Sequence, residues 1–313
     1  MTAEQAKALV NTGIQQMLED PEQWRTWAQT LSRFHQYSPG NVLLILQQRP
    51  AATHVAGYHA WRDLGRQVQK GEHGITILAP IVRRMPTEDA SAPAPAGSVS
   101  QSPTPAPMKA VVGFRVATVF DITQTQGQAL QIPQPKLLDS GDLEELLRHL
   151  ITTVVPVPVQ FAPAAQLHGA NGVWSPAQQT ITLAQDRSPD QQVKTLLHEW
   201  AHSVGVPDVT AALDRHTGSE EIIAETTAFV LAGRMGFNTA AYSLPYVGHW
   251  AQGDPQKVLA LTQSVSRRVQ SLSAVLERAA QKDPAIAPVW PSPKLTLQAQ
   301  TQAAAAAAEV EAG

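Results

Sequence analysis

The sequence predicts an α+β protein of two domains, and three observations lead to this prediction. Runs rich in β-branched residues, which are typical of strands, occur at 75–82 and 111–122. Apolar residues recur at helical spacing in later segments, most clearly at 219–237. A break with two prolines, IPQPK, separates the two parts of the chain. We therefore expect one domain at 1–132 and a second at 137–290.

The first domain is interrupted by a segment of different composition. The two strand-like runs look like neighbouring strands of one sheet, but residues 86–108 between them are mostly Pro, Ala and Ser. Such a segment buries too little apolar surface to offset its ordering entropy, so it is predicted to be a disordered insertion. The Ala-rich segment 291–313 is predicted to be a disordered tail.

The second domain begins with a predicted helix after Ser140, whose apolar residues have helical spacing. A strand is expected at 157–163, and two more are expected within 169–184, on either side of a Ser-Pro turn. The next helix takes Ser188 as its N-cap, followed by a proline in the first helical position, and Gly205 as its C-cap.

This last helix carries the sequence HEWAH at 198–202. His198 and His202 are four residues apart, so both imidazoles lie on one helix face and can bind one metal ion. In the H-E-x-x-H pattern the intervening glutamate, here Glu199, polarises the metal-bound water and moves its proton. The alternative is a half-buried helix whose two histidines make ordinary hydrogen bonds, because the bare pattern also occurs by chance.

A third ligand is expected from the helix that starts with Ser219 as its N-cap. Glu221 and Glu225 of this helix are also four residues apart, so Glu221 can bind the metal while Glu225 accepts a hydrogen bond from a ligating histidine. Glu220, beside them, is assigned to stabilisation of the helix dipole. A metzincin-like alternative uses Asp208 as the third ligand. Because Asp208 follows a glycine and a proline in a predicted loop, Glu221 is preferred.

Composition limits the remaining functions. The chain has no cysteine, which excludes disulfides and thiolate ligands, so the predicted zinc ion is held by histidine and carboxylate. The net charge of −3 gives no sign of a nucleic-acid partner for the whole chain, but residues 24–84 contain eight basic and two acidic side chains. Most aromatic residues of this region are expected in the core. The candidate DNA contacts are Arg66 and Lys70 for phosphates and Tyr37, Tyr58 and His59 for bases.

These segments resemble the ArdC antirestriction family and its relatives with an ImmA/IrrE-type metallopeptidase domain. The resemblance covers HEWAH, the run EEIIAETTAF at 220–229 and, most extensively, the runs 27–80 and 111–127 of the first domain. It implies that the first domain is an α+β single-stranded-DNA-binding module. It also implies that the second is a zincin-like metallopeptidase domain, with the zinc ligands and general base assigned above.

The predicted function is a single-stranded-DNA-binding zinc metallopeptidase with an antirestriction, mobile-element or DNA-damage role, which hydrolyses peptide bonds of a protein substrate. The alternative is a non-enzymatic protein that shields DNA from nucleases and keeps the metal site for structure. An intact Glu199 favours the enzyme, because a structural site needs no general base. The first residues lack a signal-peptide pattern and no stretch is long enough to span a membrane, so a cytoplasmic protein without a membrane partner is expected.

Overall fold

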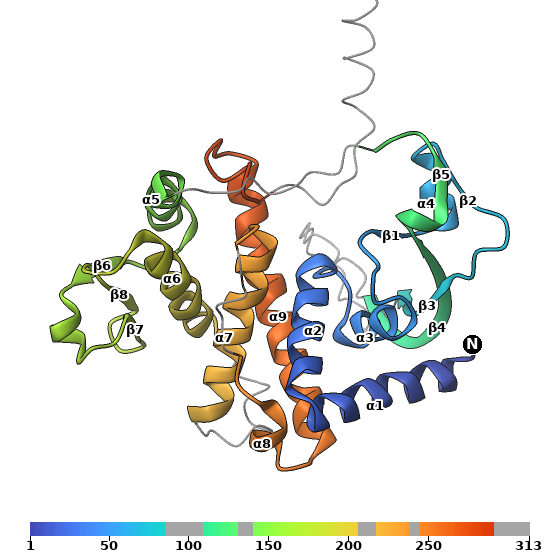
Figure 1. The fold of residues 1–313 in the computed structure, drawn as a ribbon, viewed down its shortest axis with the longest axis horizontal. Helices are drawn as coiled ribbons and strands as arrows, with labels where there is room; N and C mark the ends of the chain where they lie inside the picture. The colour runs from blue at the N-terminus through green and yellow to red at the C-terminus, as the bar shows by residue number, and fades with distance from the viewer. Residues whose placement is uncertain (85–108, 131–139, 206–216, 238, 240–243, 291–313) are drawn as a thin grey trace, which may run out of the picture.

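The structure, a computed structural model, describes residues 1–84, 109–130, 140–205, 217–237, 239 and 244–290. The predicted insertion 86–108 and the predicted tail 291–313 lie outside the described residues. The predicted α+β class is confirmed, since helices and strands occur in both halves of the chain (Figure 1).

The first half of the chain combines helices with small antiparallel sheets. Its helices are α1 (Ala3–Glu19), α2 (Pro21–Arg33), α3 (Pro39–Gln48) and α4 (Tyr58–Asp63). Its strands are β1 (Val55–Gly57), β2 (Arg66–Val68), β3 (Ile75–Arg84), β4 (Lys109–Asp121) and β5 (Thr125–Gly127). One sheet has the order β1-β4-β3, and β2 pairs with β5 in another. The two strand-like runs are thus confirmed as antiparallel neighbours, β3 and β4.

The second half carries a three-stranded sheet and longer helices. Its helices are α5 (Ser140–His149), α6 (Pro189–Ser203), α7 (Thr217–Arg234), α8 (Val247–Ala251) and α9 (Pro255–Ala280). Its strands are β6 (Val159–Ala162), β7 (Gly172–Ser175) and β8 (Thr180–Ala184), in the order β6-β8-β7. The predicted strand pair around the Ser-Pro turn is confirmed as the antiparallel pair β7 and β8, and β6 lies parallel to β8.

Local capping fixes where α6 and α7 begin and end. Ser188 is the N-cap of α6, as predicted, and its hydroxyl accepts a hydrogen bond from the backbone N–H of Gln191. The other two predicted ends are wrong. The C-cap of α6 is Val204. The backbone of Val204 is not left-handed, so this helix end does not require a glycine. Helix α7 starts at Thr217, so Ser219 lies buried inside its first turn instead of capping it.

The aromatic residues of the N-terminal region lie in the core, as expected from their spacing. Trp24, Trp27 and Phe34 are buried, and so is Trp61 at the end of the β1-β4 sheet, where its indole N–H donates to the carbonyl of Phe120. Among the described residues, no helix combines the length and the apolar character that crossing a bilayer requires.

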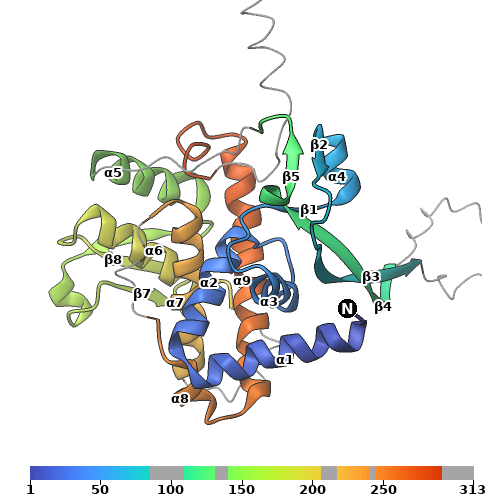
Figure 2. The same cartoon turned by 45° about the vertical axis from the view of Figure 1, so that its right-hand side comes forward.

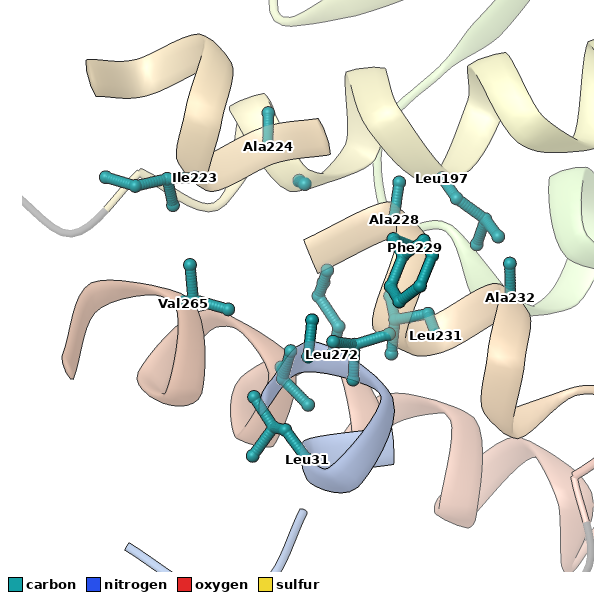
Figure 3. Packing of buried hydrophobic residues seen from close by; sticks show 14 of the residues in the cluster. Leu31, Leu197, Ile223, Ala224, Ala228, Phe229, Leu231, Ala232, Val265 and Leu272 are labelled. Carbon is teal, nitrogen blue, oxygen red and sulfur yellow. The ribbon is translucent and has the colours of Figure 1, made fainter. Parts of the chain in front are cut away.

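One hydrophobic core joins the N-terminal helices to the later ones. Helix α2 packs against α7, and α7 packs against both α6 and α9. Figure 3 shows the side chains that meet there, including Leu31 of α2, Leu197 of α6, Phe229 of α7 and Leu272 of α9. Helices from both sides of the predicted domain boundary near residue 132 therefore share this core.

Candidate metal centre

Two packed helices, α6 and α7, carry the candidate metal ligands. Helix α6 lies against the β6-β8-β7 sheet on one side and against α7 on the other. Buried Leu196, Leu197 and Ala201 hold α6 in this position, and His198 and His202 reach glutamates of α7. Because α6 and α7 are packed side by side, the first turns of α7 bring Glu221 to the two imidazoles.

The three ligand atoms have the spacing of a metal site. His198 Nε2 and His202 Nε2 are 3.1 Å apart, and the Glu221 carboxylate faces both of them, with Oε2 at 3.4 Å from His198 Nε2 and Oε1 at 3.4 Å from His202 Nε2. Zinc bonds of about 2.0–2.1 Å in a tetrahedron place ligand atoms about 3.3–3.4 Å from one another. The two imidazoles and the Glu221 carboxylate are therefore close enough together to bind one metal ion, with one ligand atom of each within 4.8 Å of the others.

The same site is open on one side. The side chains of His198 and His202 are 19% and 17% exposed, whereas that of Glu221 is 61% exposed. Solvent therefore reaches the ligands from the Glu221 side, which leaves room for a water molecule at a fourth position. Catalytic zinc sites keep such an open position, while structural ones are closed by four protein ligands.

Glu225 orients the first histidine. Its Oε2 lies 2.9 Å from Nδ1 of His198, so Nδ1–H donates to the carboxylate and Nε2 is the nitrogen that faces Glu221 and can bind a metal. Lys194, one turn earlier on α6, lies 3.7 Å from the other oxygen of Glu225. A carboxylate that fixes the tautomer of a ligating histidine is the usual support of a zinc ligand.

The electrostatics of the cluster favour a positive charge at its centre. Burial lowers the pKa of His198, but its contacts with Glu221 and Glu225 outweigh burial and raise the pKa to about 9. The pKa of Glu221 lies well below its usual range because both histidines bond to its carboxylate. In the absence of metal, His198 thus holds a proton at the position that a cation would occupy. This behaviour, together with the ligand spacing, fits a divalent cation.

Glu199 is placed as a general base would be. Its carboxylate is buried, and its Oε2 accepts a hydrogen bond of 2.8 Å from the backbone N–H of Trp174 on β7. Burial raises the pKa of Glu199, while the neighbouring His198 and His202 oppose this rise. The carboxylate is therefore easier to protonate than a solvated one, which suits a group that takes up a proton and releases it.

A buried ion pair fixes the start of the glutamate helix. Arg268 of α9 is 2% exposed, and both of its terminal nitrogens donate to Oε2 of Glu220, at 3.2 and 3.1 Å. Its guanidinium also lies beside Gly205, just past the end of α6. Sequence reasoning assigned Glu220 to the helix dipole and did not consider Arg268. In the structure the pair joins the end of one ligand helix to the start of the other.

Of the predicted metal-site residues, the structure brings together His198, Glu199, His202, Glu221 and Glu225. The rival ligand Asp208 lies outside the described residues, so the choice between it and Glu221 rests on the geometry of Glu221 alone.

Two of the predicted DNA contacts are already bonded within the chain. The guanidinium of Arg66 donates to Thr125 and to the carbonyl of Gln128. These bonds join β2 to the end of β5 and leave fewer N–H groups of Arg66 for a phosphate. The hydroxyl of Tyr37 donates to the carbonyl of Val55, and its ring packs on the core.

The other three candidates lie on the surface. Tyr58 and His59, at the start of α4, are exposed and stack edge to face, and Lys70 is exposed in the turn after β2. These three side chains remain available to a ligand. All five residues stay predictions as DNA contacts.

The fold and site define an α+β protein in which an H-E-x-x-H helix and a glutamate helix form a His-His-Glu cluster. Residues 3–120 match the sequence profile of the N-terminal domain of the anti-restriction factor ArdC, so this part of the chain is ArdC-like, as the resemblance in the sequence predicted.

Known proteins are similar to the chain over a longer range. It is 24% identical over 268 residues to an uncharacterized protein of Bacillus anthracis, which covers 78% of this chain and 45% of that protein. The chain thus spans less than half the length of this relative. It is also similar to two crystal structures of the antirestriction ArdC protein from the R388 plasmid. The metal-free form is 18% identical with a TM-score of 0.44, covering 78% of this chain and 86% of that one. The Mn(II)-bound form is 17% identical with a TM-score of 0.46, covering 82% and 99%.

Proposed function

We propose that this protein is an antirestriction-type protein that binds single-stranded DNA with its N-terminal part and hydrolyses peptide bonds at a zinc centre. The observation that carries the proposal is the cluster of His198, His202 and Glu221, whose ligand atoms are close enough to bind one metal ion, with Glu199 beside it. The match of residues 3–120 to the N-terminal domain of an anti-restriction factor supports the DNA-related role. A combination of DNA-binding and peptidase parts would direct hydrolysis to proteins that act on the same DNA.

The donor set supports zinc as the metal. Two imidazoles and one carboxylate, with a fourth position left open, are the protein ligands of many catalytic zinc sites. When bound, zinc at this site polarises a water molecule and lowers its pKa toward neutrality. Glu225 holds Nδ1 of His198 and so keeps its other nitrogen directed at the ion.

Glu199 carries the proton transfers in the proposed reaction. It takes a proton from the attacking water and delivers that proton to the amine that leaves as the peptide bond breaks. The hydrogen bond from Trp174 holds its carboxylate in place during both transfers. This arrangement, an H-E-x-x-H helix packed against a sheet whose edge strand borders the site, is what we propose to be a zincin-like domain of the ImmA/IrrE type.

The edge strand β7 provides a place for an extended substrate. Among the described strands β7 pairs only with β8, so its outer edge faces away from the sheet. The contact between Trp174 of β7 and Glu199 brings this edge to the site. A peptide added to the edge by backbone hydrogen bonds would pass the metal with its carbonyl groups in regular order.

Metal content tests the site. We expect about one zinc per chain in the wild type after dialysis against a weak chelator, and little in His202→Ala or Glu221→Gln. Glu199→Gln is the matched control, because it alters a neighbouring carboxylate that is not a ligand and should keep the metal. Equal zinc in the wild type and in His202→Ala would overturn the assignment. Retention of manganese in place of zinc would keep the site and change the metal.

Hydrolysis is tested separately. Host regulators co-expressed with the wild type should be cleaved in the presence of single-stranded DNA, and Glu199→Gln should abolish cleavage while keeping the metal. If the wild type and Glu199→Gln protect DNA from nucleases equally and neither cleaves any protein, the non-enzymatic alternative replaces the peptidase.

A further inference from the structure

Strands β3 and β4 form a ribbon that extends beyond the rest of the protein. Ile75 near the start of β3 and Val119 near the end of β4 are paired and buried in the core. Beyond Pro80 the two strands continue to pair as far as Arg84 and Lys109. Figure 2 shows this outer part reaching away from the helices, at the right of the view. We name the outer part, residues 79–84 and 109–115, the distal ribbon.

The distal ribbon exposes large apolar side chains. Phe114 is 58% exposed, and four aliphatic residues are exposed by 38–58%. These are Ile81, Val82, Val111 and Val112. They account for five of the ten large hydrophobic residues that the described part of the chain exposes. Such a concentration on one short ribbon marks an interaction surface and not scattered surface residues.

The charges of the distal ribbon are all of one sign. Its sequence, APIVRR and KAVVGFR, contains four basic residues and no acidic one. The exposed side chains of Arg83 and Arg115 make no hydrogen bond or ion pair with the described residues. In contrast, Arg66 already bonds within the chain. Free cations of this kind are suited to phosphates.

The exposed apolar residues and the basic residues together indicate which partner binds the distal ribbon. Two copies of the ribbon pairing edge to edge would bring these cations together, and like charges disfavour such pairing. A single strand of DNA offers what the ribbon lacks, which is a chain of negative phosphates and unpaired bases with apolar faces. Proteins that bind single strands without sequence preference combine cations with exposed aromatic rings on which bases stack.

We propose that the distal ribbon is the main single-strand contact of this protein. By strand alternation Phe114 lies on one face of the ribbon, where it stacks on a base, and Arg83 and Arg115 lie on the other face, where they bind phosphates of a strand that wraps around the ribbon. This inference rests on the proposed DNA binding. It makes the distal ribbon the principal contact in place of Arg66 and Tyr37. A β-bulge between Ile81 and Val82 increases the local twist of the ribbon. The paired outer segments, about 20 Å long, are long enough to contact several nucleotides.

Fluorescence anisotropy of a labelled thirty-residue oligothymidylate with the full chain tests the proposal. Phe114→Ala should weaken binding roughly 5- to 100-fold, which is the range for losing one base stack. Arg83→Ala combined with Arg115→Ala should also weaken binding and reduce the slope of log K against log salt by about 1.4, or about 0.7 for each lost phosphate contact.

The controls use exposed side chains of the same types away from the ribbon. Phe161→Ala removes a phenyl ring that is 45% exposed on β6, and Arg267→Ala with Arg278→Ala removes two exposed arginines of α9. Both control variants should bind like the wild type. Phe114→Ala should weaken single-strand binding more than duplex binding, because paired bases cannot stack on the ring.

The possible outcomes separate the inference from the proposed function. If the wild type binds the oligonucleotide and the ribbon variants bind equally well, the ribbon is not the contact and DNA binding stands. If the wild type does not bind at low salt, the proposed DNA binding itself fails. If sedimentation shows a wild-type dimer that Phe114→Ala dissociates while DNA affinity stays unchanged, the occupant of the ribbon is a second copy and the proposal is overturned.

Discussion

The buried pair of Arg268 and Glu220 makes an asymmetric prediction about stability. Arg268 is 2% exposed, whereas the Glu220 side chain is 33% exposed. Glu220→Gln leaves a positive charge that water cannot reach, and removing one partner of a buried pair costs about 3–5 kcal/mol. Because glutamine can still accept one hydrogen bond, we expect a loss of about 3 kcal/mol. Arg268→Met leaves a carboxylate that water partly solvates, so we expect a smaller loss of about 1–2 kcal/mol.

Urea unfolding of the metal-free protein measures these losses, since bound metal would add its own stabilisation to the folded state. The double variant should be more stable than Glu220→Gln alone by at least about 1 kcal/mol, because no buried charge remains in it. Lys7→Met is the control. It removes an exposed pair with Glu4 and should change stability by less than about 0.5 kcal/mol. A greater loss in Arg268→Met than in Glu220→Gln would refute the reasoning, because it would show that packing and not charge governs the pair.

Three further predictions follow from single contacts. Glu225→Gln should weaken zinc binding roughly 10- to 100-fold without abolishing it, as measured by competition with a chelating dye. Burial and the nearby Arg234 lower the pKa of His35 to about 3, so the unfolded state binds more protons between about pH 3 and 6.5. The free energy of unfolding should therefore fall as the pH falls through this range, and His35→Gln should reduce the slope of that fall. Thr226→Val should cost about 1–3 kcal/mol in urea unfolding, because it leaves a buried indole N–H of α2 without its acceptor, whereas Thr226→Ser should cost less.

The sequence predicted the parts of the site that depend on local spacing. Because positions four apart share a helix face, His198 and His202 could be paired from the sequence, and so could Glu221 and Glu225. The strand pair β3 and β4 was predictable for a similar reason, since β-branched runs are characteristic of strands. Each of these predictions uses a periodicity within a few residues and does not require knowledge of the tertiary packing.

Contacts between distant segments were not predictable in this way. Arg268 is 48 residues from Glu220, and nothing in the pattern of α9 shows that this one arginine points inward while Arg267 is exposed. The internal bonds of Arg66 depend equally on the pairing of β2 with β5. The exposure of Phe114 could not be predicted either, because an apolar strand that leaves the core has the same sequence pattern as one that stays in it.

The shared core changes how the two halves of this protein can be studied. Trp24 of α2 is fully buried, and its indole N–H donates to Thr226 of α7, one residue after Glu225. A fragment ending near residue 132 would expose the apolar face of α2 that packs on α7. Each tryptophan on that face contributes a large apolar surface, so such a fragment would lose much of its stability. DNA binding and metal binding therefore belong in assays of the full chain, and the same packing means that a change in α2 acts directly on the helix that holds Glu221.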